Sequence, residues 1–247
     1  MDLGITGRTA LVTGGSAGLG LGSARALAEA GVRICLAARN AERLQTAAAS
    51  LPGGTTTVVA DLSEPAEIDR MLADVQATIG AIDILVANSG GPPPGNFAST
   101  EYDRYSAAIQ LNMLSTIAMC KTVVPAMQQQ KWGRVVAITS VAVREPNPLL
   151  ILSNTARSGL TAFLKTTARE VAGDGVTINS VQPGIHATSR IRELYDDLEG
   201  LTAAIPTGTL GDPEDFGNVV AFLCSEQARF ITGAALPVDG GAAHSLQ

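Results

Sequence analysis

The sequence predicts an α/β protein built on one doubly wound parallel sheet of about seven strands, with helices on both faces. Short β-branched apolar runs alternate with longer stretches in which apolar residues recur three or four positions apart, a pattern typical of β–α–β crossovers. Several of the short runs end in a loop rich in glycine or asparagine. No break in composition, repeat or low-complexity tract divides the 247 residues, so we expect a single domain over residues 1–247.

Seven short apolar runs are the expected strands. In chain order they are residues 9–13, 33–38, 56–60, 82–87, 134–139, 177–181 and 235–238. Apolar residues at helical spacing lie between these runs, within residues 21–31, 67–79 and 160–171. Each crossover helix is expected to bury one face on the sheet.

Composition and charge argue against several classes of protein. With 46% hydrophobic residues, the chain has enough apolar material for a large core, so disorder is not expected. The 17 Lys and Arg residues against 23 Asp and Glu residues give a net charge of −6, which disfavours nucleic-acid binding. No apolar run approaches the roughly 18 to 20 residues that cross a bilayer, and the first residues do not resemble a secretory signal.

Cysteine and histidine content bears on the compartment and on metal binding. Cys35, Cys120 and Cys224 lie far apart in the sequence, and only His186 and His244 could join them in a metal site. Dispersed cysteines in apolar surroundings fit a reduced compartment. We therefore expect a cytoplasmic protein with no metal, no membrane segment and no nucleic-acid partner.

A glycine-rich turn directly follows the first expected strand. Residues 13–20 read T-G-G-S-A-G-L-G, so Gly14, Gly18 and Gly20 stand between that strand and a helix. Glycine lets the backbone turn sharply and approach a pyrophosphate, and the free N–H groups at a helix start favour negative charge. The succession of strand, glycines and helix predicts a dinucleotide site; the alternative is a turn needed only for packing.

With this turn and several later motifs, the chain resembles the short-chain dehydrogenases/reductases, a Rossmann-type family with the fingerprint T-G-x-x-x-G-x-G, over nearly its whole length. Among them it is similar to 3-oxoacyl-carrier-protein reductases and aldose dehydrogenases. The later matching motifs are Asp61 after the third strand, Asn88-Ser89-Gly90-Gly91 after the fourth, Leu111-Asn112, Ser140 ending the fifth strand, Pro183-Gly184 with Thr188 after the sixth, and residues 231–233 and 238–241.

The resemblance implies an NAD(P)-dependent oxidoreductase that acts on a small molecule. The implied cofactor-binding residues are Gly14, Ser16, Gly18, Leu19, Gly20, Arg39, Asp61, Leu62, Asn88, Ser89, Gly90, Arg157, Pro183, Gly184 and Thr188.

The end of the second expected strand bears on which cofactor is used. In dinucleotide folds a carboxylate here binds the ribose 2′-hydroxyl of NAD, whereas a nearby arginine accommodates the 2′-phosphate of NADP. Residues 37–40 read A-A-R-N, so no acid is present, and Arg39 offers a planar fork suited to a phosphate. We expect NADP(H) rather than NAD(H); the alternative is a solvated Arg39 and no strong preference.

The catalytic positions depart from the pattern of the family, whose usual set is Asn, Ser and a Tyr-x-x-x-Lys pair. Asn112 and Ser140 match that set, but Ser153 stands where Tyr is expected and Arg157 where Lys is expected. A serine hydroxyl is a far poorer acid than a phenol. An arginine can bind ribose hydroxyls and supply positive charge, but it does not pass a proton onward. An atypical proton donor is therefore expected.

Ser153, His186 and a water molecule are the candidate donors. His186 lies in the loop after the sixth strand, and an ordinary histidine has a pKa near 6.5; the alternative is a loop histidine that points to solvent. Tyr195, in the following segment, is expected to pack in a lid; the alternative is that it replaces the missing tyrosine acid. Arg144 and Glu145 either contact an anionic or polar substrate or pair with each other on the rim.

We expect hydride transfer to or from a carbonyl or alcohol, or to a conjugated enone, whose delocalised enolate has less need of a strong acid beside the oxygen. The alternative is a cofactor-binding protein that has lost turnover.

The resemblance also implies a homo-oligomer, a dimer or tetramer, formed through helices near residues 102–130 and 154–172. Ala156, Gly159 and Ala162 suit close helix packing, unless they face only their own sheet.

Overall fold

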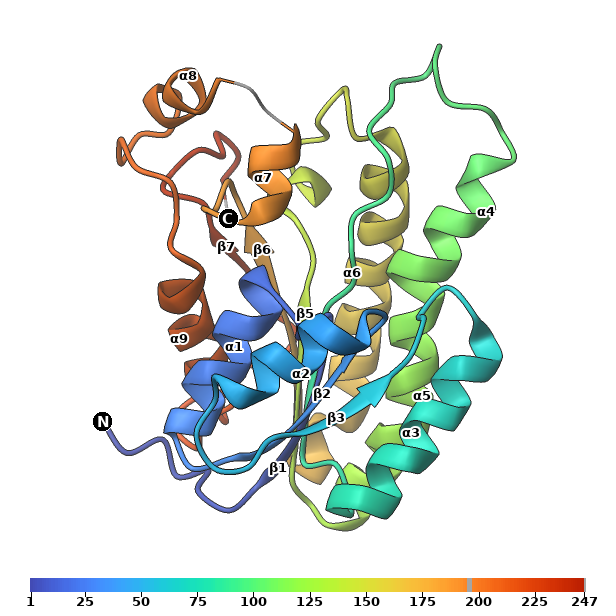
Figure 1. Ribbon diagram of the computed structural model, residues 1–247, viewed down its shortest axis with the longest axis vertical. Helices are drawn as coiled ribbons and strands as arrows, with labels where there is room; N and C mark the ends of the chain where they lie inside the picture. Colours follow the sequence, from blue (N-terminus) through green and yellow to red (C-terminus); the bar gives the residue numbers. More distant parts are fainter. Residues whose placement is uncertain (195–196, 247) are drawn as a thin grey trace.

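Seven parallel strands form one sheet, as the sequence predicts, in a computed structural model that describes residues 1–194 and 197–246 (Figure 1). The expected strands differ from the observed bounds by at most two residues at either end. The strands are β1 (Thr9–Thr13), β2 (Arg33–Ala38), β3 (Thr56–Val59), β4 (Ile84–Ala87), β5 (Gly133–Ile138), β6 (Val176–Pro183) and β7 (Ala235–Val238).

The order of the strands across the sheet is β3-β2-β1-β4-β5-β6-β7. The chain winds outward in one direction from β1 to β3 and in the other direction from β4 to β7. The direction therefore reverses between β1 and β4, and doubly wound sheets bind ligands at the carboxyl ends of the strands at such a reversal.

Helices connect the strands and cover both faces of the sheet. In chain order they are α1 (Gly18–Glu29), α2 (Ala41–Ala49), α3 (Pro65–Ile79), α4 (Arg104–Ile109), a π-helix (Gln110–Leu114), α5 (Ser115–Gln129), a 3₁₀ turn (Val141–Val143), α6 (Ile151–Val171), a second 3₁₀ turn (Ala172–Asp174), α7 (Ser189–Leu194), α8 (Leu198–Ala203) and α9 (Pro213–Leu223).

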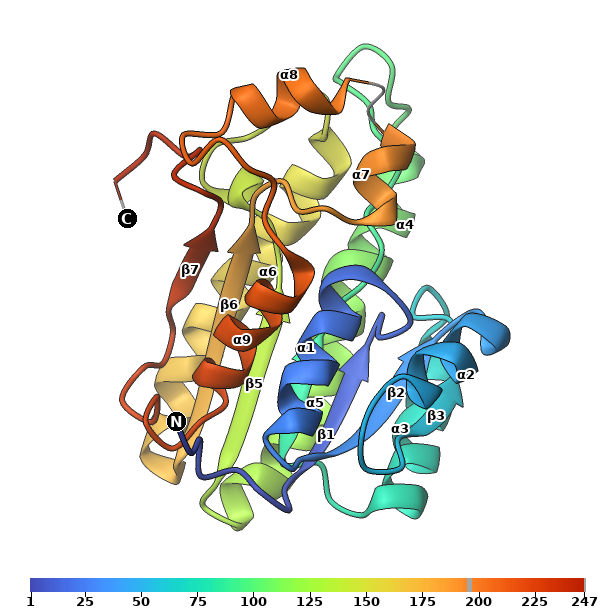
Figure 2. The ribbon, with the colours of Figure 1, turned by 60° about the vertical axis from the view of Figure 1, so that its left-hand side comes forward.

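The helices divide into two layers. Helices α1, α2 and α9 pack on one face, whereas α3, α5 and α6 pack on the other (Figure 2). Successive strand residues point to opposite faces: Leu11 of β1 packs in the layer of α3 and α5, while Ala10 and Val12 pack in the layer of α1. Both faces of β1 are therefore apolar, which explains the uninterrupted apolar run in the sequence.

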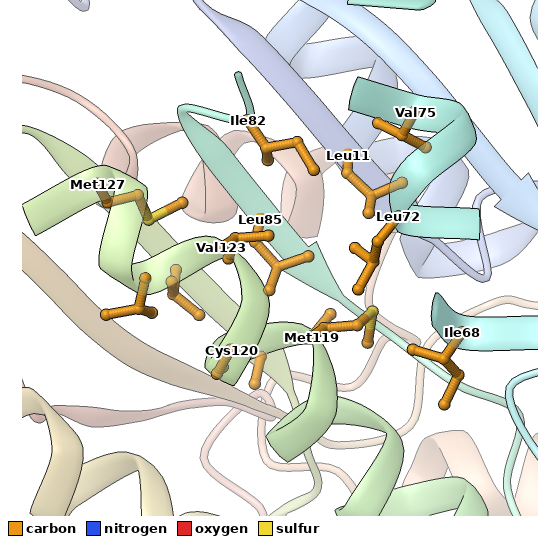
Figure 3. Packing of buried hydrophobic residues seen from close by; sticks show 14 of the residues in the cluster. Leu11, Ile68, Leu72, Val75, Ile82, Leu85, Met119, Cys120, Val123 and Met127 are labelled. Atoms are coloured by element: carbon orange, nitrogen blue, oxygen red, sulfur yellow. The ribbon is translucent and has the colours of Figure 1, made fainter. Parts of the chain in front are cut away.

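One helical stretch, Arg104–Gln129, is long and apolar enough to cross a membrane by length and composition alone. An 18-residue segment within it has a mean hydropathy of 1.3, so the expectation that no apolar segment approaches the length of a membrane span is too strong. However, 44% of that segment is buried inside the protein. Figure 3 shows Met119, Val123 and Met127 of this stretch packed with Leu85 of the sheet, as expected for a core helix.

Helix α1, which begins at the glycine-rich turn, crosses α9 at very short range. A Cβ atom added at Gly22 of α1 would overlap the carbonyl oxygen of Pro213 at the start of α9. A Cβ atom added at Gly217 of α9 would overlap the carbonyl oxygen of Gly22. The two glycines let the helix backbones touch, and this contact fixes the position of α1 and hence of the turn.

We expect Gly22→Ala to lower the free energy of unfolding by about 1–3 kcal/mol, because the methyl group meets a rigid carbonyl rather than a movable side chain. Urea unfolding followed by far-UV circular dichroism measures this. Gly173→Ala is the matched control, since a Cβ atom there meets no atom within 4 Å. Equal stability of the two variants would contradict the close crossing.

Candidate active site

A cleft of about 420 Å³ opens at the carboxyl ends of the strands, where the winding direction of the sheet reverses. Its size is in the range of small-molecule sites. Of the residues implied as cofactor-binding, the following line it: Gly14, Ser16, Gly18, Leu19, Arg39, Asp61, Leu62, Asn88, Ser89, Gly90, Arg157, Pro183 and Thr188. The structure thus brings together residues from most of the length of the chain.

Gly20 and Gly184 do not line the cleft, but packing explains both. A Cβ atom at Gly20 would overlap the carbonyl oxygen of Gly14, and one at Gly184 would lie 2.7 Å from the Cα atom of Asp239. These glycines let neighbouring backbone segments approach closely, and so they help to position the segments that line the cleft.

The glycine-rich turn is held by Asn88, the residue that follows β4. Thr13 accepts a hydrogen bond from the backbone N–H of Asn88 at 2.9 Å and donates its hydroxyl to the Asn88 carbonyl at 2.8 Å. The Asn88 side chain donates to the carbonyl of Gly14 at 3.3 Å. Gly14 and Gly18 have φ angles of 57° and 55°, in the left-handed region that favours glycine.

The start of α1 is suited to a phosphate group. Its N-cap residue, Ala17, has no side chain that could accept a hydrogen bond from the first turn. The first N–H groups of a helix have no partner within the helix, so here they can meet an anion in the cleft. The turn and the helix start therefore fit the pyrophosphate of a dinucleotide.

Arg39 and Asp61 lie together at the β2 and β3 side of the cleft. The Arg39 guanidinium is 3.8 Å from the Asp61 carboxylate, and its side chain is 72% exposed. Burial acts to raise the pKa of Asp61, but hydrogen bonds from Ser63 and the charge of Arg39 outweigh it, so the pKa lies below its usual value. Asp61 is therefore ionised at neutral pH, and Arg39 keeps part of its fork open to the cleft.

Arg43, which sequence reasoning missed, also lines the cleft near Arg39. It lies in the first turn of α2, where its backbone N–H donates to the side chain of the N-cap residue Asn40 at 2.8 Å. The feature of the sequence that could have identified it is a second arginine four residues after Arg39. Two guanidinium groups thus lie at the end of β2, where the sequence predicts the 2′-phosphate.

Arg157 lies at the other end of the cleft and is 7% exposed. Its guanidinium donates to the carbonyl of Ile138, at the end of β5, at 2.8 Å and to the carbonyl of Ser89 at 3.3 Å. Burial lowers the pKa of Arg157 to about 10, so the group remains a cation at neutral pH. No ion pair involves Arg157 in the part of the chain that the structure describes.

Asn112 lies in the π-helix between α4 and α5, where the sequence suggests one continuous helix. Its amide donates to the Ser89 hydroxyl at 2.7 Å and to the Gly90 carbonyl at 2.8 Å, and the residue is 1% exposed. Such π-turns are frequent at functional sites. Ser89 therefore accepts from both Asn112 and Arg157, and joins two of the implied catalytic residues.

Ser140 and Ser153 lie outside the lining of the cleft. Ser140 follows β5 and is half-buried; its hydroxyl oxygen accepts a hydrogen bond from the backbone of Ala142 at 3.1 Å, and this caps the 3₁₀ turn. Its hydroxyl proton stays available to a second partner. Ser153 is buried on α6, one helical turn before Arg157 and so on the same face of that helix.

His186 neither lines the cleft nor points to solvent, so the solvent-exposed alternative is wrong. Its ring is 3% exposed and packs edge-on against Phe216 of α9, with ring centroids 5.0 Å apart. Its Nδ1 atom lies 3.3 Å from the carbonyl oxygen of Gly184, and burial lowers its pKa. This position gives no support to a role as proton donor, because the imidazole is wedged between the β6 loop and α9.

Arg144 and Glu145 do not pair with each other. Arg144 donates to the side chain of Gln182 and to the carbonyl of Ala235, both at 2.6 Å, and so ties the 3₁₀ turn to β6 and β7. The Glu145 carboxylate accepts from the backbone N–H of Ser245. The expected lid residue Tyr195 lies outside the described residues.

The chain has many relatives. The profile of a family described as enoyl-(acyl carrier protein) reductase matches residues 14–243. The 3-oxoacyl-[acyl-carrier-protein] reductase of Escherichia coli K12 is 35% identical over 236 residues, which are 95% of this chain and 97% of that protein.

Two solved structures are similar along nearly their whole length. The L-sorbose reductase of Gluconobacter frateurii, complexed with NADPH and L-sorbose, has a TM-score of 0.94 and 29% identity, with 100% of both chains covered. An NADPH-bound short-chain oxidoreductase of Pseudomonas aeruginosa PAO1, described as containing an atypical catalytic centre, has a TM-score of 0.89 and 28% identity, with 97% of this chain and 98% of that one covered. The chain described here therefore belongs to the short-chain dehydrogenase/reductase family of oxidoreductases.

Proposed function

We propose that this protein is an NADP(H)-dependent oxidoreductase that transfers a hydride to or from a carbonyl or alcohol, or to a conjugated enone, without a tyrosine acid. The observation that carries the proposal is the cleft itself. At one end it has the glycine-rich turn, the uncapped start of α1 and two arginines beyond β2; at the other it has the buried cation of Arg157. The NADPH complexes of related proteins support this choice of cofactor.

The preference for NADP(H) rests on the charges beyond β2. A ribose 2′-phosphate is a dianion or nearly so, and forked guanidinium groups bind phosphates well. Arg39 and Arg43 offer two such groups, and no carboxylate stands at the end of β2 to accept a ribose 2′-hydroxyl. Arg39 is largely exposed, so solvent screens part of its contribution.

When bound, the nicotinamide supplies or accepts the hydride. In our account Arg157 binds the ribose hydroxyls and keeps a positive charge beside the reacting end. Ser140 follows the cleft-lining residue Thr139, and its hydroxyl oxygen is occupied by the Ala142 N–H. Its O–H donates a hydrogen bond to the carbonyl oxygen of the substrate and polarises it, without transferring the proton. The proton that completes the alcohol comes from Ser153 or from solvent. Loss of the tyrosine acid is expected to cost about 10²- to 10⁴-fold in rate on a simple ketone and less on an enone.

A cofactor-binding protein without turnover is the second candidate, favoured by the replacement of both acid–base residues by Ser153 and Arg157. A panel of ketones, enones and acyl thioesters mixed with protein and NADPH separates the two. Loss of the nicotinamide absorbance band supports the enzyme. Tight NADPH binding without oxidation across the panel supports the second candidate.

We also propose a homo-oligomer, a dimer or tetramer, formed through α5 and α6. Of the small residues on α6 considered above, Ala156 is fully buried in its own fold and Gly159 faces Met113 of the π-helix, so Ala162 alone of the three is exposed. Sedimentation velocity at micromolar concentration tests the proposal, and a monomer would refute it.

The described cysteines are free and buried, which supports a reducing compartment such as the cytoplasm.

Replacing either arginine beyond β2 should shift cofactor preference. We expect Arg39→Gln and Arg43→Gln each to raise the Kd for NADPH by about 10-fold, the effect of one charge-assisted hydrogen bond, and to leave the Kd for NADH nearly unchanged. Fluorescence titration of both nucleotides measures this. Arg229→Gln, an exposed arginine outside the cleft lining, is the control. Tighter binding of NADH than of NADPH by the unaltered protein would overturn the assignment.

The pH profile should differ from that of a tyrosine-dependent enzyme. Among the described residues that line the cleft, the ionisable groups are arginines and Asp61, so we expect kcat to be flat from about pH 6 to 9. Burial lowers the pKa of Arg157 to about 10, so its charge is present below that pH and is lost above it, where kcat should fall. Burial lowers the pKa of His186, so an inflection below the ordinary histidine pKa of about 6.5 that disappears in His186→Asn would instead make His186 the proton donor.

A further inference from the structure

The charges that line the cleft are unbalanced. Arg39, Arg43, Arg157 and Arg190 line it, and Asp61 is the single carboxylate among the described lining residues. The chain as a whole has a net charge of −6, so positive charge is concentrated here against the overall excess of acid. Arg39 and Arg43 face the position proposed for the 2′-phosphate, and Asp61 lies beside Arg39.

Arg157 and Arg190 approach the same loop from different elements. Arg157, on α6, donates to the carbonyl of Ser89 at 3.3 Å, and Arg190, on α7, donates to the carbonyl of Pro92 at 3.4 Å. Both distances are near the long limit of a hydrogen bond, so these two contacts are weak. Arg157 is held more firmly by its bond to the Ile138 carbonyl at 2.8 Å, whereas the Pro92 contact leaves the Arg190 guanidinium freer to bind a ligand. The two cations therefore lie at the same end of the cleft, over the loop that follows β4.

Neither cation has a carboxylate partner within residues 1–194 and 197–246. A buried charge without a counter-ion is costly, and Arg157 is 7% exposed. The ribose hydroxyls that Arg157 would bind are neutral and do not offset its charge. The pyrophosphate is assigned to the start of α1. An anionic group on the substrate would offset the positive charge of both guanidinium groups.

We propose that the substrate carries a carboxylate, which the exposed guanidinium of Arg190 binds in a forked pair of hydrogen bonds while Arg157 attracts it from the buried side. A planar guanidinium matches a carboxylate with two parallel N–H···O bonds. This proposal rests on the proposed function and makes the substrate an oxo acid, or an unsaturated oxo acid, rather than a neutral ketone.

Three acid and ester pairs test the proposal: pyruvate, acetoacetate and levulinate, each against its methyl ester. The pairs differ in charge and vary the distance between the oxo and carboxyl groups. We expect kcat/KM with NADPH to favour at least one acid over its ester. In Arg190→Gln that acid-to-ester ratio should fall about 10- to 100-fold, the effect of losing hydrogen bonds to a charged group. Arg190→Lys should recover part of it, because it keeps the charge without the fork.

Arg192→Gln is the matched control, because Arg192 is exposed on the same short helix and does not line the cleft. Its acid-to-ester ratio should equal that of the unaltered protein. An equal fall in both variants, or no preference for any acid in the unaltered protein, would overturn the proposal. A raised Kd for NADPH in Arg190→Gln with an unchanged ratio would also overturn it, by assigning Arg190 to the cofactor.

Calorimetric titration of the same acids and esters into the NADPH complex separates this proposal from the proposed function. If neither these compounds nor the panel of ketones, enones and acyl thioesters is turned over, the proposed function fails, but binding of an acid and not its ester, lost in Arg190→Gln, still supports the carboxylate site. If esters and neutral ketones are reduced and no acid binds more tightly than its ester, the proposed function stands and the carboxylate site is refuted.

Discussion

The candidate site depends on one junction, the reciprocal pair of hydrogen bonds between Thr13 and Asn88. It joins the ends of β1 and β4 at the point where the sheet changes direction. The glycine-rich turn leaves from one side of this junction, and the loop that Asn112 and Arg157 contact leaves from the other. Because Asn88 also binds the Gly14 carbonyl, the floor of the cleft is fixed by the protein itself.

Under the proposed function, Arg157 and Ser153 stand at the positions of the family's lysine and tyrosine. The buried guanidinium of Arg157 supplies positive charge there and spans from the end of β5 to the loop after β4. Ser153 offers no acidic phenol, and the imidazole of His186 packs against Phe216. Such a site can bind an anion or stabilise negative charge that develops on the substrate oxygen, but it has no strong acid among its described groups. Substrates that need only late protonation suit such a site.

Much of the architecture follows from local patterns in the sequence. The strands, the turn and the place of Arg39 in the cleft could be predicted, because apolar runs, glycine spacing and the residue that follows β2 act over a few neighbouring positions. The π-helix around Asn112 could not, since it depends on the amide reaching Ser89 and Gly90 across the fold. Arg190 and the inward turn of His186 are likewise set by tertiary contacts. The close crossing at Gly22 could not be predicted either, because it depends on the position of α9, which lies far from Gly22 in the sequence.

A crystal structure of the protein with NADPH would show whether the cleft holds a dinucleotide. We expect the pyrophosphate at the start of α1, the 2′-phosphate between Arg39 and Arg43, and the nicotinamide beside Arg157. A nucleotide bound elsewhere, or crystals and solutions in which neither NADPH nor NADH binds at all, would contradict this expectation.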